Sequence, residues 1–223
     1  MSQAVMTERW ALVICDLQED HLRSLPAEQR QDVVQSAARL LDLAAFHKWA
    51  VVFSGLRFPS GYQGVSERHR LFGALRRQNE RFGDEKIHFF LEGTEGAKPI
   101  PEVTLPEETV FCWRKSLHPF RAAEGEQGLE KQLHDRKITR VVLMGAKTST
   151  AVLAAAQWLC DMSIATYVAE TAVGDESLQA PACEVIGKFA DVFKNVDDMI
   201  KAINEELMIS QFLQKGRDPP EGG

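Results

Sequence analysis

The chain has 223 residues, of which 44% are hydrophobic and 26% are charged, and this composition is ordinary for a soluble globular protein. Its net charge of −6 argues against a general binder of nucleic acid or of a membrane surface. No apolar run reaches the roughly 18–20 residues that span a bilayer, and residues 1–10 lack the apolar core of a secretory signal. The four cysteines form no CxxC pair, so we expect reduced cysteines, no metal or other cofactor, and a cytoplasmic location.

Apolar runs and helical periodicities alternate along the chain. We expect strands at residues 10–15, 49–54, 109–113, 141–144, 164–169 and 190–193. Helices are expected at residues 27–47, 65–82, 129–136, 178–189 and 196–208, and directly after the fourth strand. Strand, helix and strand at this spacing form βαβ units with right-handed crossovers. The predicted fold class is therefore α/β, a three-layer αβα domain with a six-stranded, mostly parallel, doubly wound sheet.

The sequence contains no repeat and no linker, so residues 1–208 are expected to form one domain. Residues 209–223 are expected to be a largely disordered tail, since they include two prolines and end in two glycines. Residues 83–107 are interrupted by Gly and Pro and form a long irregular segment. Such segments in compact domains tend to be lids, binding loops or oligomer contacts.

Charged residues follow two of the predicted strands. Asp16 ends the first strand, at the edge where open α/β sheets hold their ligands, although an Asp there is as often a turn or helix cap. Arg114 and Lys115 end the third strand, where a cation pair would balance Asp16 across a cleft or simply lie on the surface. Arg57 and the arginine-rich helix at 65–82 indicate a solvated face, or a clamp for a substrate carboxylate.

The segment at residues 141–159 reads as strand, turn and helix. Gly145 permits a sharp exit from the strand, and the hydroxyls of Thr148, Ser149 and Thr150 lie where a helix needs N-caps. The amides at the start of this helix would suit an oxyanion or another anion. For this segment alone, an ordinary buried βα unit is the preferred explanation of the pattern.

In this order, the parts resemble the isochorismatase-like hydrolase superfamily, also called the cysteine hydrolases, over roughly residues 9–205. "ALVICDLQED" looks like the family's first strand and catalytic aspartate, which would be Asp16. "ITRVVLMGAKTSTAV" looks like its strand, its cis-peptide turn and the start of its nucleophile helix. "ATYVAETAVGDES" and "GYQGVSERHRLFGAL" resemble its fifth strand and the second-helix motif of a bacterial branch.

The resemblance implies an Asp that acts as a general base, a Lys that stabilises charge and a Cys that attacks a carbonyl. It also implies a cis peptide between Ala146 and Lys147. This sequence departs from the pattern, because Ala151 occupies the nucleophile position and cannot attack. The family's spacing places Arg114 where the lysine is usual, with Lys115 one residue away. Two apolar residues, Leu56 and Phe58, stand where nicotinamidases of the family bind a metal.

The resemblance leaves two functions open. The first is a hydrolase that acts without cysteine on a small, anionic substrate, with Asp16 as acid or base and Lys115 or Arg114 as its electrostatic partner. Substrate contacts would come from Gln18, Arg57, Ala146, Lys147 and Thr148, near Ala151. The second is a catalytically silent protein that binds a ligand or a partner. A lysine facing Asp16 would favour the first, and an arginine held by Asp16 would favour the second. Members of the family are usually dimers or tetramers, so the resemblance implies a homo-oligomer.

Overall fold

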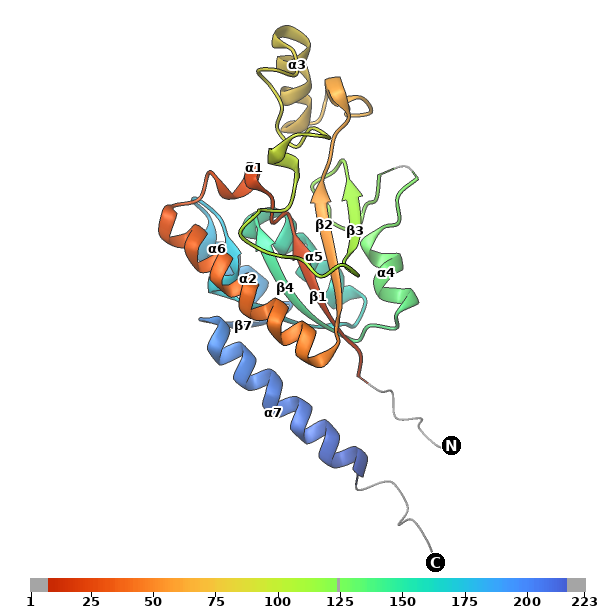
Figure 1. Cartoon of the computed structure of the whole chain (residues 1–223), viewed down its shortest axis with the longest axis vertical. Helices are drawn as coiled ribbons and strands as arrows, with labels where there is room; N and C mark the ends of the chain where they lie inside the picture. Colours follow the sequence, from red (N-terminus) through yellow and green to blue (C-terminus); the bar gives the residue numbers. More distant parts are fainter. Residues whose placement is uncertain (1–7, 124, 216–223) are drawn as a thin grey trace, which may run out of the picture.

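The computed structural model describes residues 8–123 and 125–215 and contains one twisted sheet between two layers of helices (Figure 1). The strands are β1 (Trp10–Cys15), β2 (Ala50–Leu56), β3 (Val110–Arg114), β4 (Arg140–Ala146), β5 (Ala165–Ala169), β6 (Val173–Gly174) and β7 (Asp191–Phe193). Their order is β3-β2-β1-β4-β5-β7, with β6 beside β4, and every pair is parallel. The predicted three-layer α/β class is confirmed. The extra strand, β6, is two residues long, too short to leave an apolar run in the sequence.

The chain reverses its direction of winding between β1 and β4. From β1 it adds β2 and β3 on one side, and it then returns to place β4, β5 and β7 on the other. Every residue of β1 is buried because both of its faces are covered, as in other parallel sheets. The C-terminal end of β1 lies between its two neighbours, with Cys15 opposite Ser54 on β2 and Gly145 on β4. This is the switch point at which open α/β sheets bind ligands.

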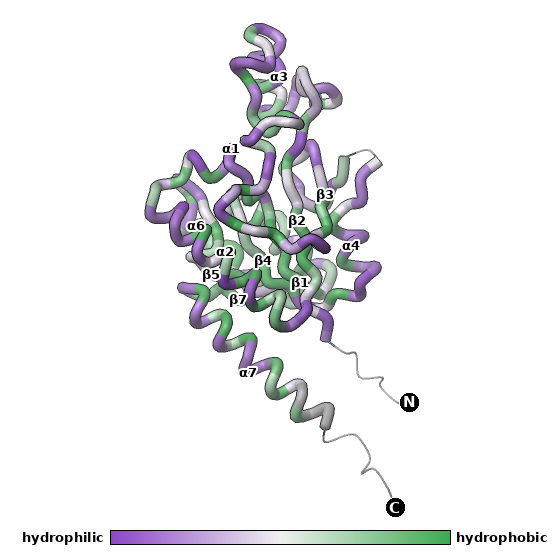
Figure 2. Tube along the Cα trace, in the orientation of Figure 1, coloured by the Kyte–Doolittle hydropathy of each residue, from purple (hydrophilic) through white to green (hydrophobic). Residues whose placement is uncertain are grey.

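Helices cover both faces of the sheet (Figure 1). On one face lie α2 (Ala27–His47) and α7 (Val196–Lys215), and on the other lie α4 (Leu129–Asp135), α5 (Leu153–Asp161) and α6 (Gln179–Ile186). Alternate residues of β1 enter the two cores: Leu12 and Ile14 pack on the α2 side, and Ala11 and Val13 on the α5 side. Figure 2 shows the strands as the most hydrophobic part of the trace.

The predicted helix at 65–82 forms only in its second half, as α3 (Phe72–Phe82). Residues 65–71 form turns and irregular backbone, and the backbone of Glu67 lies against Gly73, where a Cβ would not fit. With the short helix η1 (Ser60–Tyr62), α3 stands beyond the end of the sheet (Figure 1). This region has its own apolar cluster, formed by Leu56, Phe58, Tyr62, Val65, Phe72, Phe90 and Leu91.

The tail prediction is wrong over residues 209–215, because α7 continues to Lys215. Polar contacts hold the later turns of this helix. Glu206 accepts a hydrogen bond from Tyr167 and pairs with Arg140 at 2.5 Å, and Ser210 donates to Glu8 at 3.1 Å. The rest of the predicted tail, 216–223, lies outside the described residues. Across the described part of the chain, no helix combines the length and apolar composition that crossing a membrane requires.

Candidate functional site

Asp16 follows β1 directly and is held in a left-handed backbone conformation, with φ at 52°. Asp adopts this conformation more readily than most residues. Its N–H donates to the carbonyl of Ser54 at 2.8 Å, and its own carbonyl accepts from Gln18 at 2.7 Å, so the chain turns tightly into α1 (Glu19–Leu22). The side chain is 3% exposed. The sequence therefore places a carboxyl group at the switch point, almost out of contact with water.

Arg114 is the cation that faces Asp16. It ends β3 and is 1% exposed, and its guanidinium donates to Asp16 Oδ2, to the carbonyl of Ser116, and to Ser54 Oγ at 3.3 Å. Lys115 points elsewhere, since its ammonium lies 3.7 Å from where a Cβ on Gly64 would stand. Successive side chains of a strand point to opposite sides, so only one of the two cations reaches the carboxyl group.

Burial dominates the electrostatics of Asp16. It raises the pKa of this carboxyl to about 6, against the lowering influence of Arg114. Burial and the Asp16 charge together raise the pKa of the adjacent Cys15 thiol to about 12. A thiol with so high a pKa carries almost no thiolate at neutral pH.

His21, on α1, is a site residue that the sequence reasoning missed. Its Nε2 lies 3.6 Å from Asp16 Oδ2, and its ring centroid is 4.5 Å from that of Phe90. Burial, and then the nearby charges of Arg114 and Lys147, lower the pKa of His21 to about 3, so the ring is neutral at physiological pH. Its position depends on the tight turn after Asp16, which brings α1 back over the end of β1 and for which the sequence gives no clear signal.

The turn after β4 brings Ala146 and Lys147 to the same edge of the sheet, and the peptide bond between them is cis. The chain then makes one wide helical turn, η3 (Thr148–Val152), before α5 begins. Ala151 is 2% exposed and packs among apolar side chains. No thiol therefore stands at this position.

None of the three hydroxyls predicted as N-caps makes a side-chain cap hydrogen bond, so that prediction is wrong, and two of them have other partners. Thr148 Oγ1 bonds Gln179 Oε1 at 2.6 Å, and Ser149 donates both its hydroxyl and its N–H, the latter at 3.0 Å, to the carboxylate of Asp175. A residue far along the chain, Asp175, thus accepts the hydrogen bond of an N–H in the first turn. A protein carboxylate already lies at this helix start, which weakens the expected anion site there.

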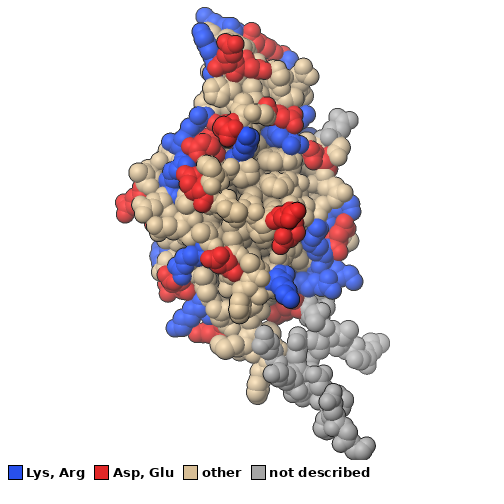
Figure 3. Space-filling model, in the orientation of Figure 1, with Lys and Arg blue, Asp and Glu red and all other residues tan. Residues whose placement is uncertain are grey.

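Three predicted substrate contacts are engaged by the protein itself. Gln18 donates both amide hydrogens to the carbonyls of Leu56 and Ala97, so it has no N–H left for a ligand. Arg57 pairs with Glu126 at 2.7 Å and lies over the Trp113 ring, and Lys147 bonds Glu176 at 2.5 Å. Arg57 and Lys147 therefore stand at the site as members of ion pairs. Figure 3 shows Lys and Arg interspersed with Asp and Glu over the face in view, without a continuous basic patch.

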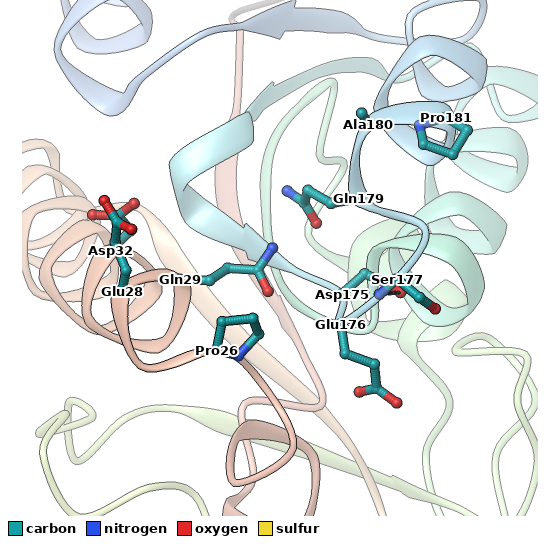
Figure 4. Close-up of a pocket in the computed structure, with 10 residues that line it drawn as sticks. All are labelled: Pro26, Glu28, Gln29, Asp32, Asp175, Glu176, Ser177, Gln179, Ala180 and Pro181. Carbon is teal, nitrogen blue, oxygen red and sulfur yellow. Dashed lines mark hydrogen bonds between the residues drawn. The ribbon is translucent and has the colours of Figure 1, made fainter.

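A hollow of about 400 Å³ lies beside this site, between the start of α2 and the segment that leads into α6 (Figure 4). It is lined by Pro26, Glu28, Gln29, Asp32, Asp175, Glu176, Ser177, Gln179, Ala180 and Pro181. None of the predicted site residues lines it. Four of its lining residues are acidic, yet no group of three or more potential metal ligands occurs among residues 8–123 and 125–215.

The buried, neutral His21 predicts a pH dependence of stability. The folded protein holds the pKa of His21 near 3 and the unfolded chain near 6.5, so the unfolded state binds more protons between these values. As pH falls from 6.5 towards 4, the free energy of unfolding should decrease less in His21→Phe than in the wild type. The two decreases should differ by at least about 1 kcal/mol, because each unit of pKa shift corresponds to about 1.4 kcal/mol. Urea unfolding at several pH values measures this difference. If the free energies of unfolding of the two proteins changed equally with pH, the prediction would be contradicted.

Solved structures share this fold. A cysteine hydrolase from Pseudomonas syringae pv. phaseolicola 1448A is 15% identical, with a TM-score of 0.67 over 92% of this chain and 99% of its own. An isochorismatase-like hydrolase from Alkaliphilus metalliredigens is 15% identical, with a TM-score of 0.64 over 87% and 98%. A pyrazinamidase of Pyrococcus horikoshii, solved in complex with zinc, is 20% identical, with a TM-score of 0.62 over 82% and 98%. Comparison with curated proteins gives no match.

The sequence also matches a family model over residues 10–196, and that model describes the isochorismatase domain. The match begins at β1 and ends where α7 begins, so it contains all seven strands and every residue of the site described above. The chain therefore belongs to the isochorismatase family.

Proposed function

We propose that this protein is a hydrolase that acts on a small substrate without a cysteine nucleophile, with Asp16 as its acid and base. One observation carries the proposal. Arg114 binds only one oxygen of the Asp16 carboxyl group, and the other oxygen, Oδ1, is buried with no hydrogen-bond partner among the described residues. A buried polar atom left in this way costs about 1–3 kcal/mol, so a carboxyl group held like this is suited to a task other than structural pairing.

The electrostatics of the pair support the same role. A group transfers protons most efficiently when its pKa lies near the working pH, and burial brings the pKa of Asp16 to about 6. Arg114 does not deprotonate, so it stabilises negative charge and leaves proton transfer to Asp16. Arg57 and Lys147 already have acidic partners, so the proposal no longer includes an anionic substrate.

The homo-oligomer and the cytoplasmic location stay predictions.

The zinc of the Pyrococcus horikoshii pyrazinamidase is not carried over to this chain. The positions that the family resemblance gives to metal ligands hold Leu56 and Phe58, whose side chains are 1% and 0% exposed and have no donor atom. Both pack in the apolar cluster under α3. The residues present do not fit a metal at that place, so no step of the proposed reaction uses one.

A second candidate function is a silent binding protein. The observation that favours it is the same Asp16–Arg114 pair, because a permanent buried ion pair can stabilise a fold without any reaction. Ala151, buried at the position of the nucleophile, agrees with this alternative. The two functions differ in whether the protein turns over any substrate through Asp16.

The test is a hydrolysis screen of purified protein with isochorismate, small amides, N-carbamoyl compounds and esters. Asp16→Asn keeps the size and an acceptor oxygen for Arg114 but removes the transferable proton, so we expect it to lower turnover by about 10²–10⁴-fold. Asp197→Asn is the matched control, because Asp197 also pairs with an arginine but lies exposed on α7. Thermal melting confirms that each variant is folded. A screen without turnover that depends on Asp16 would overturn the hydrolase and leave the binding protein.

A further inference from the structure

His21 and Asp16 each present a buried polar atom without a partner. Nε2 of His21 and Oδ1 of Asp16 make no hydrogen bond to any described residue. The two groups are neighbours, since Nε2 lies 3.6 Å from the other carboxyl oxygen, too far for a direct hydrogen bond and close enough for a shared small ligand. Two neighbouring side chains that each bury an unpartnered polar atom are better explained by a group that bonds both than by chance.

Packing alone does not account for a histidine here. The ring of His21 rests against Phe90, and its side chain is only 12% exposed. A phenylalanine would supply the same contact without burying a nitrogen. The charged groups that face the imidazole are Asp16, Arg114 and Lys147, and the last is paired with Glu176. In this setting the ring stays neutral, so an unprotonated nitrogen remains available as a hydrogen-bond acceptor.

We propose that His21 is a second catalytic residue, which together with Asp16 holds and orients the water that attacks the substrate. This inference rests on the proposed hydrolase function. Without a cysteine, water itself must form the new bond. A water molecule that donates one hydrogen to Asp16 Oδ1 and the other to His21 Nε2 satisfies both orphan atoms. It also directs a lone pair of its oxygen away from them, towards a substrate.

The step balances within these residues. The water oxygen forms a bond to an electrophilic carbon, and its proton passes to the Asp16 carboxylate. The bond between that carbon and the leaving group then breaks, and Asp16 returns the proton to the leaving group. His21 accepts a hydrogen bond throughout and keeps its own proton. Arg114 stabilises the carboxylate before the transfer and after the return.

The experiment compares wild type with Asp16→Asn, His21→Phe and His21→Gln on the best substrate from the screen. His21→Phe keeps the aromatic contact and removes Nε2, so we expect kcat to fall about 10²-fold or more while KM changes little. His21→Gln places an amide near Nε2 and should recover part of the loss. His47→Phe is the matched control, because His47 also stacks on an aromatic ring, that of Trp49, at the opposite end of β2. Melting temperatures are measured for all variants.

The outcomes separate the two proposals. Turnover that needs Asp16 but is unchanged in His21→Phe would overturn the role of His21 and leave the hydrolase intact. A rise in KM without a fall in kcat would assign His21 to substrate binding and would also overturn the proposal. Absence of any turnover that depends on Asp16 would overturn the hydrolase, and the water site with it.

Discussion

Replacing Gly145 with alanine is expected to destabilise the protein by more than about 4 kcal/mol, a loss reached by few single substitutions. Gly145 lies on β4 opposite Cys15, and its φ is +124°. A Cβ at this position would overlap the carbonyl oxygen of Cys15, which is backbone of the central strand. No side-chain rotation relieves that overlap, so two strands must separate where they pair. Domains have only about 5–15 kcal/mol of stability in total, so the variant loses a large share of it.

Gly187→Ala is the matched control for this prediction. Gly187 ends α6 with φ at −60°, and the nearest atom to an added Cβ is 3.4 Å away. Its free energy of unfolding in urea should stay within about 0.5 kcal/mol of the wild type. A Gly145→Ala protein that is soluble and within 1 kcal/mol of the wild type would show that β1 and β4 tolerate the added methyl group, contrary to the expectation.

The fold followed from the sequence because the central strands leave strong local signals. The apolar runs of β1 and β4 and the stripe of α2 each identify an element without knowledge of the rest. The errors occur where contacts that are not part of the local hydrophobic pattern decide the structure. In the last turns of α7, Ser210 bonds Glu8 near the other end of the chain, and at 65–71 the backbone of Glu67 packs against Gly73. Neither contact has a local signature.

The site was predictable in its position and less so in its contacts. Asp16 at the end of β1 follows from strand length alone, but the choice between Arg114 and Lys115 depends on which side of β3 faces the switch point. A shift of one residue exchanges the two. Two other contacts of the site could not be predicted, because no local pattern in the sequence indicates them. Asp175 caps η3 from 26 positions further along the chain, and His21 reaches Asp16 through a tight turn.

Arg114→Met is the second substitution with a large expected effect. It removes the guanidinium from Asp16 and from the carbonyl of Ser116 and leaves a carboxyl group buried without its cation. Breaking one side of a buried pair costs about 3–5 kcal/mol, and we expect a loss of this size at pH 8 in urea unfolding. Arg39→Met is the control, since Arg39 pairs with Asp197 on the surface and should contribute at most about 1 kcal/mol.

The stability that Arg114→Met loses relative to the wild type should be smaller at lower pH. Arg114 acts to lower the pKa of Asp16, so without it that pKa rises above about 6, while the unfolded chain keeps a value near 3.8. The folded variant then binds more protons than the unfolded chain between these values, and its stability falls as pH rises through them. At pH 5 the carboxyl group is protonated and the penalty is smaller than at pH 8. An equal loss at both values would show that Arg114 acts through packing alone.

The double variant Asp16→Asn/Arg114→Met connects this measurement to function. With no charge left at either position, it should be more stable at pH 8 than Arg114→Met alone. Its free energy of unfolding, taken together with those of the wild type, Asp16→Asn and Arg114→Met, gives the coupling between the two charges. A large coupling with no turnover describes a pair kept for structure, as in the binding protein. A large coupling in a protein whose turnover requires Asp16 would mean that Arg114 sets the proton affinity of a catalytic acid. The interaction that stabilises the fold would then also fix the pH at which Asp16 works.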